Sequence, residues 1–324
     1  MAVFTQLDDA DVAEIARAFD LGEVTAWRAI PAGTINSNFA VDTRRGRFFL
    51  RINEGKTESD VRYEAELVSE LARAGVPVVA PLGAASGEPL WPFGERFASV
   101  FPWVEGGHRD RGEVSERDAE AVGAALASLH EAGLPLARRF ARRGIYTFDD
   151  IVGRFEGLRE SADPALAPAI AAVAEEIPWL RERAPLREAA AHGVIHGDLF
   201  RDNVVFRGDR LAALIDFEQA SSGSLVYDLA VCINAWCFDE DVDERLVRAM
   251  VGGYLERRAW TDADRSALPV ELRASAMRFA VTRITDVYLA GVENPEKDFR
   301  RYVRRLERWR ALGSEALERL LPAS

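Results

Sequence analysis

The feature that most constrains this chain is a polar stretch set between apolar residues, Val194-Ile-His-Gly-Asp-Leu-Phe-Arg-Asp-Asn203. Short β-type runs follow over residues 204–206 and 211–215, and Arg207-Gly-Asp-Arg210 between them predicts a hairpin turn. The second run ends in Leu214-Ile-Asp-Phe217. Because a hairpin returns the chain to its starting edge, we expect the polar side chains at its two ends to lie close together.

Three of these side chains suit phosphoryl transfer to a hydroxyl group. Such a reaction needs a carboxylate beside the attacking oxygen and hard oxygen ligands for Mg²⁺. Asp198 can supply the carboxylate, Asn203 an amide-oxygen ligand and Asp216 a second ligand. The order and spacing of these residues therefore predict a kinase-type site.

The whole set, HGDLFRDN followed by IDF and by Tyr227-Asp-Leu-Ala230, resembles the aminoglycoside phosphotransferase-like kinases. This resemblance implies an α+β, bilobal protein-kinase-like fold. It comprises a small N-terminal lobe, with an antiparallel sheet plus a helix, and a larger, mostly helical C-terminal lobe. It also implies ATP and Mg²⁺ as cofactors and a small-molecule acceptor.

Roles carry over by resemblance onto the matching positions. Asp198 is the expected catalytic base, or the group that orients the hydroxyl, and Asn203 and Asp216 are the expected Mg²⁺ ligands. His196 is expected to support the loop by hydrogen bonding. Asp228 is expected to hold the loop through its backbone.

The pattern along the chain fits two lobes, residues 1–103 for nucleotide binding and residues 104–324 for the catalytic loop and acceptor. Before the glycine-ended connector at 102–107 the chain is rich in strands, and after it the chain is mostly helical. Residues 148–190 are predicted to form helices broken near Pro164, Pro168 and Pro178. The elements expected in the N-terminal lobe are helices over 9–19 and 59–74, and strands over 24–30, 39–43, 48–52, 78–82 and 97–101.

The resemblance is looser in the N-terminal lobe. Arg51 stands where such kinases usually carry a phosphate-binding lysine, and Glu64, or alternatively Glu66, would be its helix partner. Lys56 lies outside the strand and is expected to be solvated. The remaining residues expected to bind the nucleotide are Asn36, Ser37 and Asn38 in the phosphate loop of residues 32–38, and Pro102 and Val104 in the connector.

The amino-acid sequences of the loop and of residues 225–237 look most like those of the type II homoserine kinases of bacteria. That resemblance implies transfer from ATP to L-homoserine, a step toward threonine. An amino-acid acceptor needs an acidic partner for its ammonium group and an arginine for its carboxylate. Asp198 would face the substrate hydroxyl, and the other candidates are Arg201, Asp202, Asn234, Arg278 and Arg283.

Two alternatives stay open: a kinase for an aminoglycoside, choline or another small alcohol, and a non-catalytic pseudokinase. The formal net charge of −12 argues against a nucleic-acid partner and would suit a polycationic acceptor. No apolar run approaches a membrane span, and the acidic N-terminus is unlike a secretory signal. We therefore expect a cytoplasmic monomer or homodimer with no membrane partner.

Overall fold

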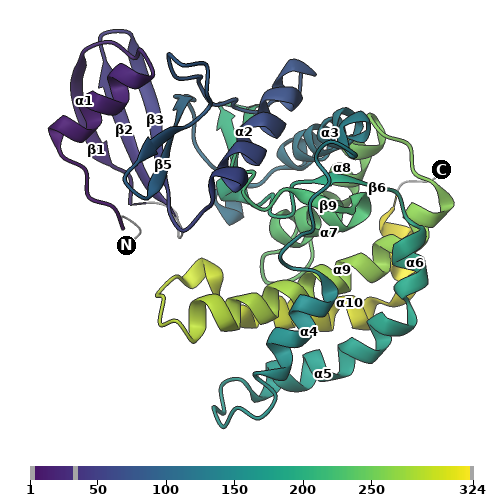
Figure 1. The fold of residues 1–324 in the computed structure, drawn as a ribbon. Helices are drawn as coiled ribbons and strands as arrows, with labels where there is room; N and C mark the ends of the chain where they lie inside the picture. Colours follow the sequence, from purple (N-terminus) through teal and green to yellow (C-terminus); the bar gives the residue numbers. More distant parts are fainter. Residues whose placement is uncertain (1–3, 32–35, 322–324) are drawn as a thin grey trace. The chain divides into compact units, whose positions relative to one another are not determined.

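The computed structural model describes residues 4–31 and 36–321, apart from the side chains of residues 314–316, 318 and 319 (Figure 1). The chain divides into two compact units. The smaller unit consists of Met1–Gly106 with Ala212–Glu218, and the larger of Gly107–Leu211 with Gln219–Ser324. The first crossing between the units thus lies three residues beyond the boundary that the connector suggested.

The smaller unit is built on an antiparallel sheet in the order β1-β2-β3-β5-β4. Its described elements are α1 (Asp9–Ala18), β1 (Val24–Ala29), β2 (Ser37–Thr43), β3 (Gly46–Asn53), α2 (Glu58–Arg73), β4 (Trp91–Phe93) and β5 (Arg96–Pro102).

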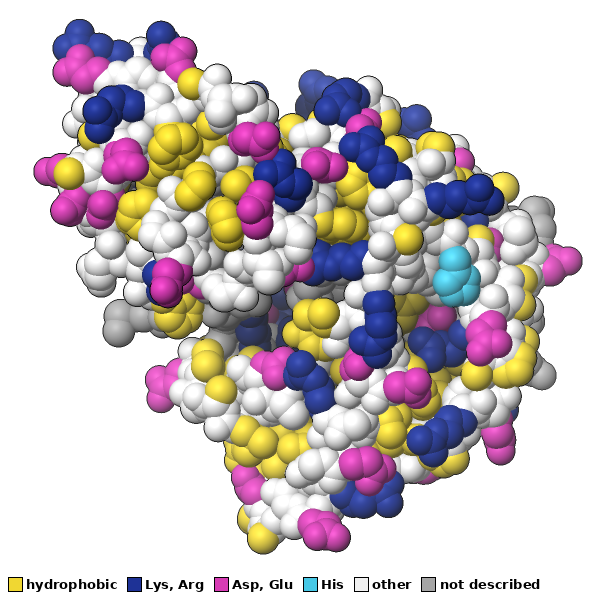
Figure 2. All heavy atoms as spheres, viewed as in Figure 1, with side chains coloured by type: hydrophobic (Ala, Val, Ile, Leu, Met, Phe, Trp, Pro, Cys, Tyr) yellow, Lys and Arg dark blue, Asp and Glu magenta, His cyan; other side chains and the backbone are white. Residues whose placement is uncertain are grey.

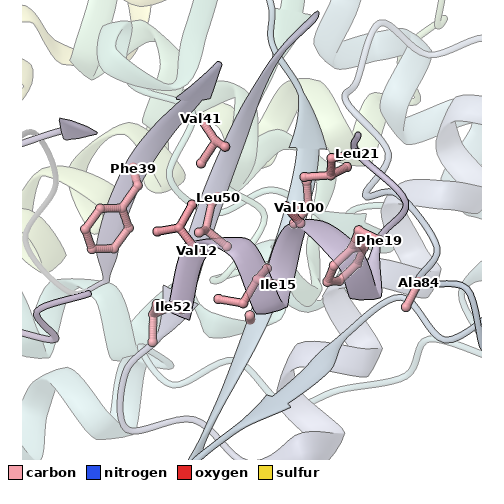
Figure 3. Packing of buried hydrophobic residues seen from close by; sticks show 12 residues of the cluster. Val12, Ile15, Phe19, Leu21, Phe39, Val41, Leu50, Ile52, Ala84 and Val100 are labelled. Carbon is pink, nitrogen blue, oxygen red and sulfur yellow. The ribbon is translucent and has the colours of Figure 1, made fainter. Parts of the chain in front are cut away.

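Helix α1 covers one face of this sheet. Asp8 and Asp11 form a reciprocal capping box at the start of α1, which satisfies amides that would otherwise lack partners. Val12 and Ile15 lie one turn apart and pack against Leu50 and Val100 of the sheet (Figure 3). The apolar spacing of residues 9–19 therefore predicted both the helix and its buried face.

One predicted strand is wrong. Residues 78–82 form no strand along β5: only the amide of Leu82 bonds to it, at the carbonyl oxygen of Val100 (2.7 Å). The strand that pairs there is β4, and Val78 instead makes an isolated bridge with Leu214. Pro81 has no amide hydrogen, so this segment cannot continue a ladder. Gly94, at φ 57°, provides the turn between β4 and β5.

The larger unit is mostly helical, as the resemblance implied. Its described elements include α3 (Glu116–Gly133), α4 (Phe148–Glu156), α5 (Ala167–Glu182), α6 (Ala184–Ala189), β6 (His192–Ile195), β7 (Val204–Arg207), β9 (Ser221–Ser224), α7 (Leu225–Trp236), α8 (Glu244–Leu255), α9 (Asp262–Arg283) and α10 (Phe299–Leu320); β8 (Arg210–Leu214) begins in this unit.

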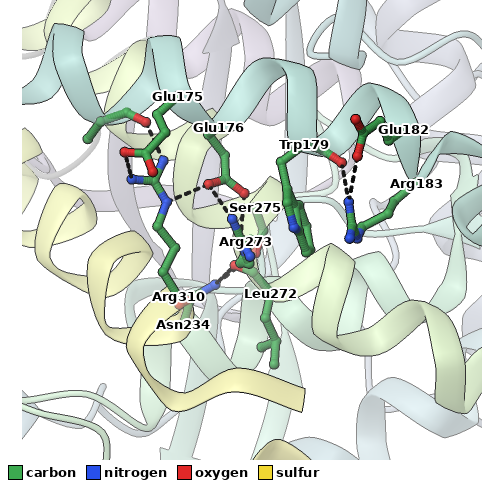
Figure 4. Close-up of polar contacts among 11 residues, drawn as sticks. Glu175, Glu176, Trp179, Glu182, Arg183, Asn234, Leu272, Arg273, Ser275 and Arg310 are labelled. Carbon is green, nitrogen blue, oxygen red and sulfur yellow. Dashed lines mark hydrogen bonds and ion pairs between the residues drawn. The ribbon is translucent and has the colours of Figure 1, made fainter.

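The predicted helix break at Pro178 is also wrong, because Pro178 lies inside α5. A proline there removes one backbone hydrogen bond, but side-chain contacts hold the helix in place. Glu176 is fully buried and accepts from Arg273 of α9 at 2.7 and 2.8 Å and from Arg310 of α10 at 2.7 Å (Figure 4). These charge-assisted bonds join α5 to both neighbouring helices.

Charged side chains of both signs are interspersed over the face drawn in Figure 2. None of the described helices combines the length and the apolar content needed to cross a membrane.

Helices α3 and α8 approach each other through two glycines. A β-carbon on Gly123 would lie 2.0 Å from the carbonyl oxygen of Met250, and one on Gly253 would lie 2.1 Å from that of Glu120. Both distances are far below contact, so only glycine permits this packing. A β-carbon on Gly252 would meet nothing within 4 Å.

We predict that Gly253→Ala lowers the free energy of unfolding by about 1–3 kcal/mol, because overpacking outweighs the gain in helix propensity. Gly252→Ala, one residue away on the same helix, should instead raise it by up to about 1 kcal/mol. Urea denaturation of both variants measures this difference. Equal shifts in the two variants would contradict the close approach of α3 and α8.

Candidate active site

The polar stretch forms a loop between β6 and β7 in the larger unit. Strand β6 pairs antiparallel with β9, and the loop starts at His196. Gly197 has φ 78°, a left-handed conformation that a side chain would strain. A β-carbon at this position would also lie 3.4 Å from the carbonyl oxygen of Gln219. Glycine therefore suits the loop at this position both by conformation and by space.

A buried carboxylate holds the backbone of this loop. Asp228, in the first turn of α7, is fully buried. Its Oδ2 accepts from the amide of His196 at 2.7 Å and its Oδ1 from the amide of Gly197 at 2.8 Å. Asp228 therefore contacts the backbone of the loop, as expected for a residue that supports it.

The side chain of His130, at the end of α3, completes this arrangement. Its Nε2 lies 3.1 Å from Oδ2 of Asp228, and its Nδ1 lies 2.8 Å from the hydroxyl of Tyr254. Burial alone would raise the pKa of Asp228, but the hydrogen bond and charge of His130 outweigh burial and lower this pKa. A carboxylate is therefore kept ionised inside the protein.

Asp198 directs its carboxylate toward two polar side chains. Its Oδ2 accepts from Nε2 of Gln219 at 3.0 Å, and its Oδ1 lies 3.5 Å from Nη1 of Arg278. The side chain is 25 % exposed, so a substrate can still reach it. Burial raises the pKa of Asp198 above the ordinary aspartate value, whereas the charge of Arg278 opposes that rise. A raised pKa makes this carboxylate a stronger base.

Arg278 is itself fixed from several sides. It donates to the side-chain oxygen of Gln219, and its guanidinium lies 3.7 Å from the ring centroid of Phe279 and 4.4 Å from that of Tyr146. Arg278 was considered for the acceptor, yet here it supports Asp198. Gln219 and Tyr146 were missed, and the signal for Gln219 was its place two residues after IDF.

Asn203 is anchored to the same loop. Its Nδ2 donates to the backbone oxygen of Asp198 at 2.8 Å, and the residue is buried. With the amide nitrogen used in this way, the amide oxygen is the atom through which Asn203 could bind a metal ion.

In the smaller unit, Arg51 of β3 lies at the centre of a buried charge network. Its Nη1 lies 2.9 Å from Oε1 of Glu64 and 3.5 Å from Oε1 of Glu218. Burial alone would lower the pKa of Arg51, but Glu64, Glu218 and Asp216 together raise it. Of the two glutamates considered as its helix partner, the structure pairs Arg51 with Glu64.

The expectation that Lys56 is solvated is wrong. Its ammonium group lies 2.8 Å from Oε2 of Glu218, and its side chain is 17 % exposed. Asn36 also donates to Glu218, and its oxygen accepts from the amide of Glu54 at 3.1 Å. Glu218, which follows IDF, was not singled out from the sequence, although it connects these groups.

Ser37 does not offer its side chain to a nucleotide. It is fully buried, accepts from the amides of Phe4 and Thr5 at 2.8 Å each, and donates to Glu54 at 2.7 Å. The expected phosphate-binding role of Ser37 is therefore corrected to a structural one. Residues 32–35 of the same expected loop lie outside the described residues.

The other residues expected around the nucleotide lie on or beside the sheet. Asn38 of β2 is the cross-strand neighbour of Arg51. Pro102 ends β5 opposite Phe48, and Val104 follows it in the connector. Asp216 has φ 66°, a left-handed conformation that aspartate tolerates better than most residues.

Among the acceptor candidates, Asn234 is wrong. It is fully buried, and its amide nitrogen donates to Leu272 and Ser275 (Figure 4). Its oxygen accepts from Trp309 at 2.9 Å. These contacts use the donors and the acceptor of the side chain in helix packing. Asp202 is exposed, Arg201 donates to the backbone oxygen of Ala235 at 3.0 Å, and Arg283 donates to that of Glu296 at 2.9 Å.

We predict that Asp228→Asn lowers the free energy of unfolding by about 2–4 kcal/mol at neutral pH, since one carboxylate oxygen becomes an amide facing a backbone donor. The folded-state pKa of Asp228 is lowered, so its stabilisation is present above about pH 3.9 and is lost as the pH falls through the folded value. The difference in the free energy of unfolding between wild type and Asp228→Asn should therefore become smaller as the pH is lowered.

Chemical denaturation of both proteins at several pH values measures this difference. The matched control is Asp241→Asn, which changes an exposed aspartate paired with Arg308 and should shift stability by about 0.5 kcal/mol or less. Equal stability of the Asp228 variant and wild type at neutral pH would refute the role of this carboxylate.

Known proteins share this arrangement of elements. Among solved structures, an amicoumacin kinase in complex with AMP-PNP, Ca²⁺ and Ami superposes with a TM-score of 0.70 at 14% identity, covering 98% of this chain and 96% of that chain. A microcompartment-associated aminopropanol kinase gives a TM-score of 0.70 at 19% identity, covering 96% and 98%. These similarities show that the fold is the protein-kinase-like one.

Other proteins are more similar to this chain in sequence than these solved structures are. A protein named homoserine kinase from Beijerinckia indica is 38% identical over 291 residues, covering 88% of each chain. One from Parvibaculum lavamentivorans is 35% identical over 322 residues, covering 98% of each. The family model described as the phosphotransferase enzyme family matches residues 26–264. The chain therefore belongs to the phosphotransferase enzyme family, together with relatives named homoserine kinase.

Proposed function

We propose that this protein transfers the γ-phosphoryl group of ATP to the hydroxyl of L-homoserine, giving O-phospho-L-homoserine and ADP. The observation that carries this proposal is the similarity to proteins named homoserine kinase, which extends over nearly the whole chain. The fold and the geometry of the loop at Asp198 support the same reaction class.

Asp198 is the group proposed to face the acceptor hydroxyl. Its carboxylate is held by Gln219 and Arg278 but remains a quarter exposed. The hydroxyl oxygen forms the new bond to phosphorus, the bond to the ADP oxygen breaks, and the hydroxyl proton passes to Asp198. Positioning of this kind supplies most of the catalysis in phosphoryl transfer.

Asn203 and Asp216 are the residues proposed to hold Mg²⁺. An amide oxygen and a carboxylate are ligands that Mg²⁺ prefers, and the amide nitrogen of Asn203 is already used by Asp198. Asp216 precedes Gln219 by three residues, so their Cα atoms are at most about 11 Å apart. When bound, Mg²⁺ neutralises charge that develops on the phosphates.

Residues of the smaller unit are proposed to bind ATP. Arg51 carries a fixed positive charge that could face a phosphate, and Glu64 holds it in place. Pro102 offers a carbonyl oxygen but no amide hydrogen, and Val104 offers both groups. The carbonyl oxygen of Pro102 could accept a hydrogen bond from the adenine, and the amide of Val104 could donate one to it.

A coupled assay of ADP release tests the proposal, with L-homoserine, choline and an aminoglycoside compared at equal concentration. We expect release with homoserine well above the other two acceptors. Asp198→Asn, which keeps the size of the side chain but removes its charge, should lower kcat by about 10²–10⁴-fold. Release with choline or the aminoglycoside but none with homoserine would overturn the choice of substrate.

A further inference from the structure

Five arginines converge in the larger unit beside the catalytic loop. Arg201 follows the loop, Arg111 comes from a short helical turn at 111–113, and Arg283 ends α9; Arg301 and Arg305 lie one turn apart on α10. We call these residues the arginine cluster. Burial lowers the pKa of Arg201, Arg283 and Arg305, and the charges of Arg111, Arg201 and Arg283 add to the lowering at Arg305.

The carboxylate of Glu296 is held by several members of this cluster, and Oδ1 of Asp239 lies 3.8 Å from Nη1 of Arg111. Oε2 of Glu296 lies 2.5 Å from Arg111 and 3.0 Å from Arg201, and Oε1 lies 3.1 Å from Arg301. Arg283 donates to the backbone oxygen of the same residue at 2.9 Å. The Glu296 side chain is 57 % exposed, so its carboxylate enters the cluster from the surface.

Deeper groups of the cluster are not matched by Glu296. Arg305 is 5 % exposed and lies over the rings of Tyr302 and Phe238, at 4.3 and 5.2 Å from their centroids. Within the described residues, no carboxylate pairs with Arg305, and the fully buried hydroxyl of Tyr302 has no hydrogen-bond partner. A buried cation and a buried hydroxyl without such partners offer an anion a positive charge and a hydrogen-bond donor.

The cluster packs directly against the loop that carries Asp198. Phe200, two residues after Asp198, lies 4.8 Å from Phe279 and 6.3 Å from Tyr302, measured between ring centroids. Arg283 lies over the Tyr302 ring at 4.4 Å. Arg201 belongs to this loop, and the guanidinium of Arg283 lies 5.5 Å from the centroid of the Phe200 ring. A small acceptor whose hydroxyl meets Asp198 would therefore have arginines of the cluster on the same loop.

We propose that the arginine cluster, with the hydroxyl of Tyr302, binds the carboxylate of the acceptor amino acid, and that Glu296 occupies part of this site until the substrate displaces it. The inference rests on the proposed function and adds to it. It makes Arg305 and Arg301 residues that determine specificity, and it makes Glu296 an internal competitor for the substrate carboxylate.

Steady-state kinetics with L-homoserine test the proposal, using 3-amino-1-propanol, which is homoserine without its carboxylate, as a competitive inhibitor. Arg305→Met should raise KM for homoserine by about 10- to 100-fold, because a charge-assisted contact is lost, with a much smaller change in kcat. The inhibition constant of 3-amino-1-propanol should stay within about twofold of the wild-type value, because this compound has no carboxylate to lose.

Glu296→Gln is the second variant of this experiment. The position is exposed, so we expect the variant to fold. Removal of the competing charge should lower KM for homoserine by about two- to tenfold. Matched controls are Arg248→Met and Glu244→Gln, which break an exposed pair on α8 and should leave KM unchanged.

The outcomes separate the two proposals. Wild-type protein that releases no ADP with homoserine overturns the proposed function and this inference with it. If wild type is active with homoserine but neither variant changes KM, the proposed function stands and the carboxylate site is refuted. A parallel rise for homoserine and for 3-amino-1-propanol in Arg305→Met would mean that the cluster is only structural.

Discussion

The buried carboxylate of Asp228 is the interaction on which the rest of the site depends. It spans the amides of His196 and Gly197 and so sets the backbone from which Asp198 projects. An ionised group in the interior is expensive unless it is fully hydrogen-bonded, and His130 supplies the remaining contact. Two helices, α3 and α7, are thereby joined to a single loop, so helix packing determines where the carboxylate of Asp198 lies.

Each unit carries its own charge network. In the larger unit, Arg278 and Gln219 orient Asp198, and in the smaller one Arg51 is surrounded by Glu64 and Glu218. Glu218 and Gln219 are adjacent in the chain but belong to different units. The peptide bond between Glu218 and Gln219 therefore joins a member of one network to a member of the other.

Much of this could be predicted from local signals. Helical spacing located α1 and α2, and the order of Asp198, Asn203 and Asp216 indicated the reaction class. Features fixed by tertiary contacts could not be predicted. Strand β9 reads Ser-Ser-Gly-Ser and has no strand pattern of its own, so its pairing with β6 was missed. Asn234 and Ser37 looked like ligand-binding residues because sequence cannot reveal that helix packing and the N-terminal segment already use their hydrogen bonds.

The central claim is that Asp198 acts on the hydroxyl, whereas Asn203 and Asp216 hold the metal ion. Titration of Mn²⁺ in the presence of a non-hydrolysable ATP analogue, followed by electron paramagnetic resonance, tests it directly. Asp216→Asn keeps a residue that tolerates the left-handed backbone and should weaken nucleotide-dependent Mn²⁺ binding by about tenfold or more, whereas Asp198→Asn should bind Mn²⁺ like wild type. Unchanged Mn²⁺ affinity in Asp216→Asn would contradict the account.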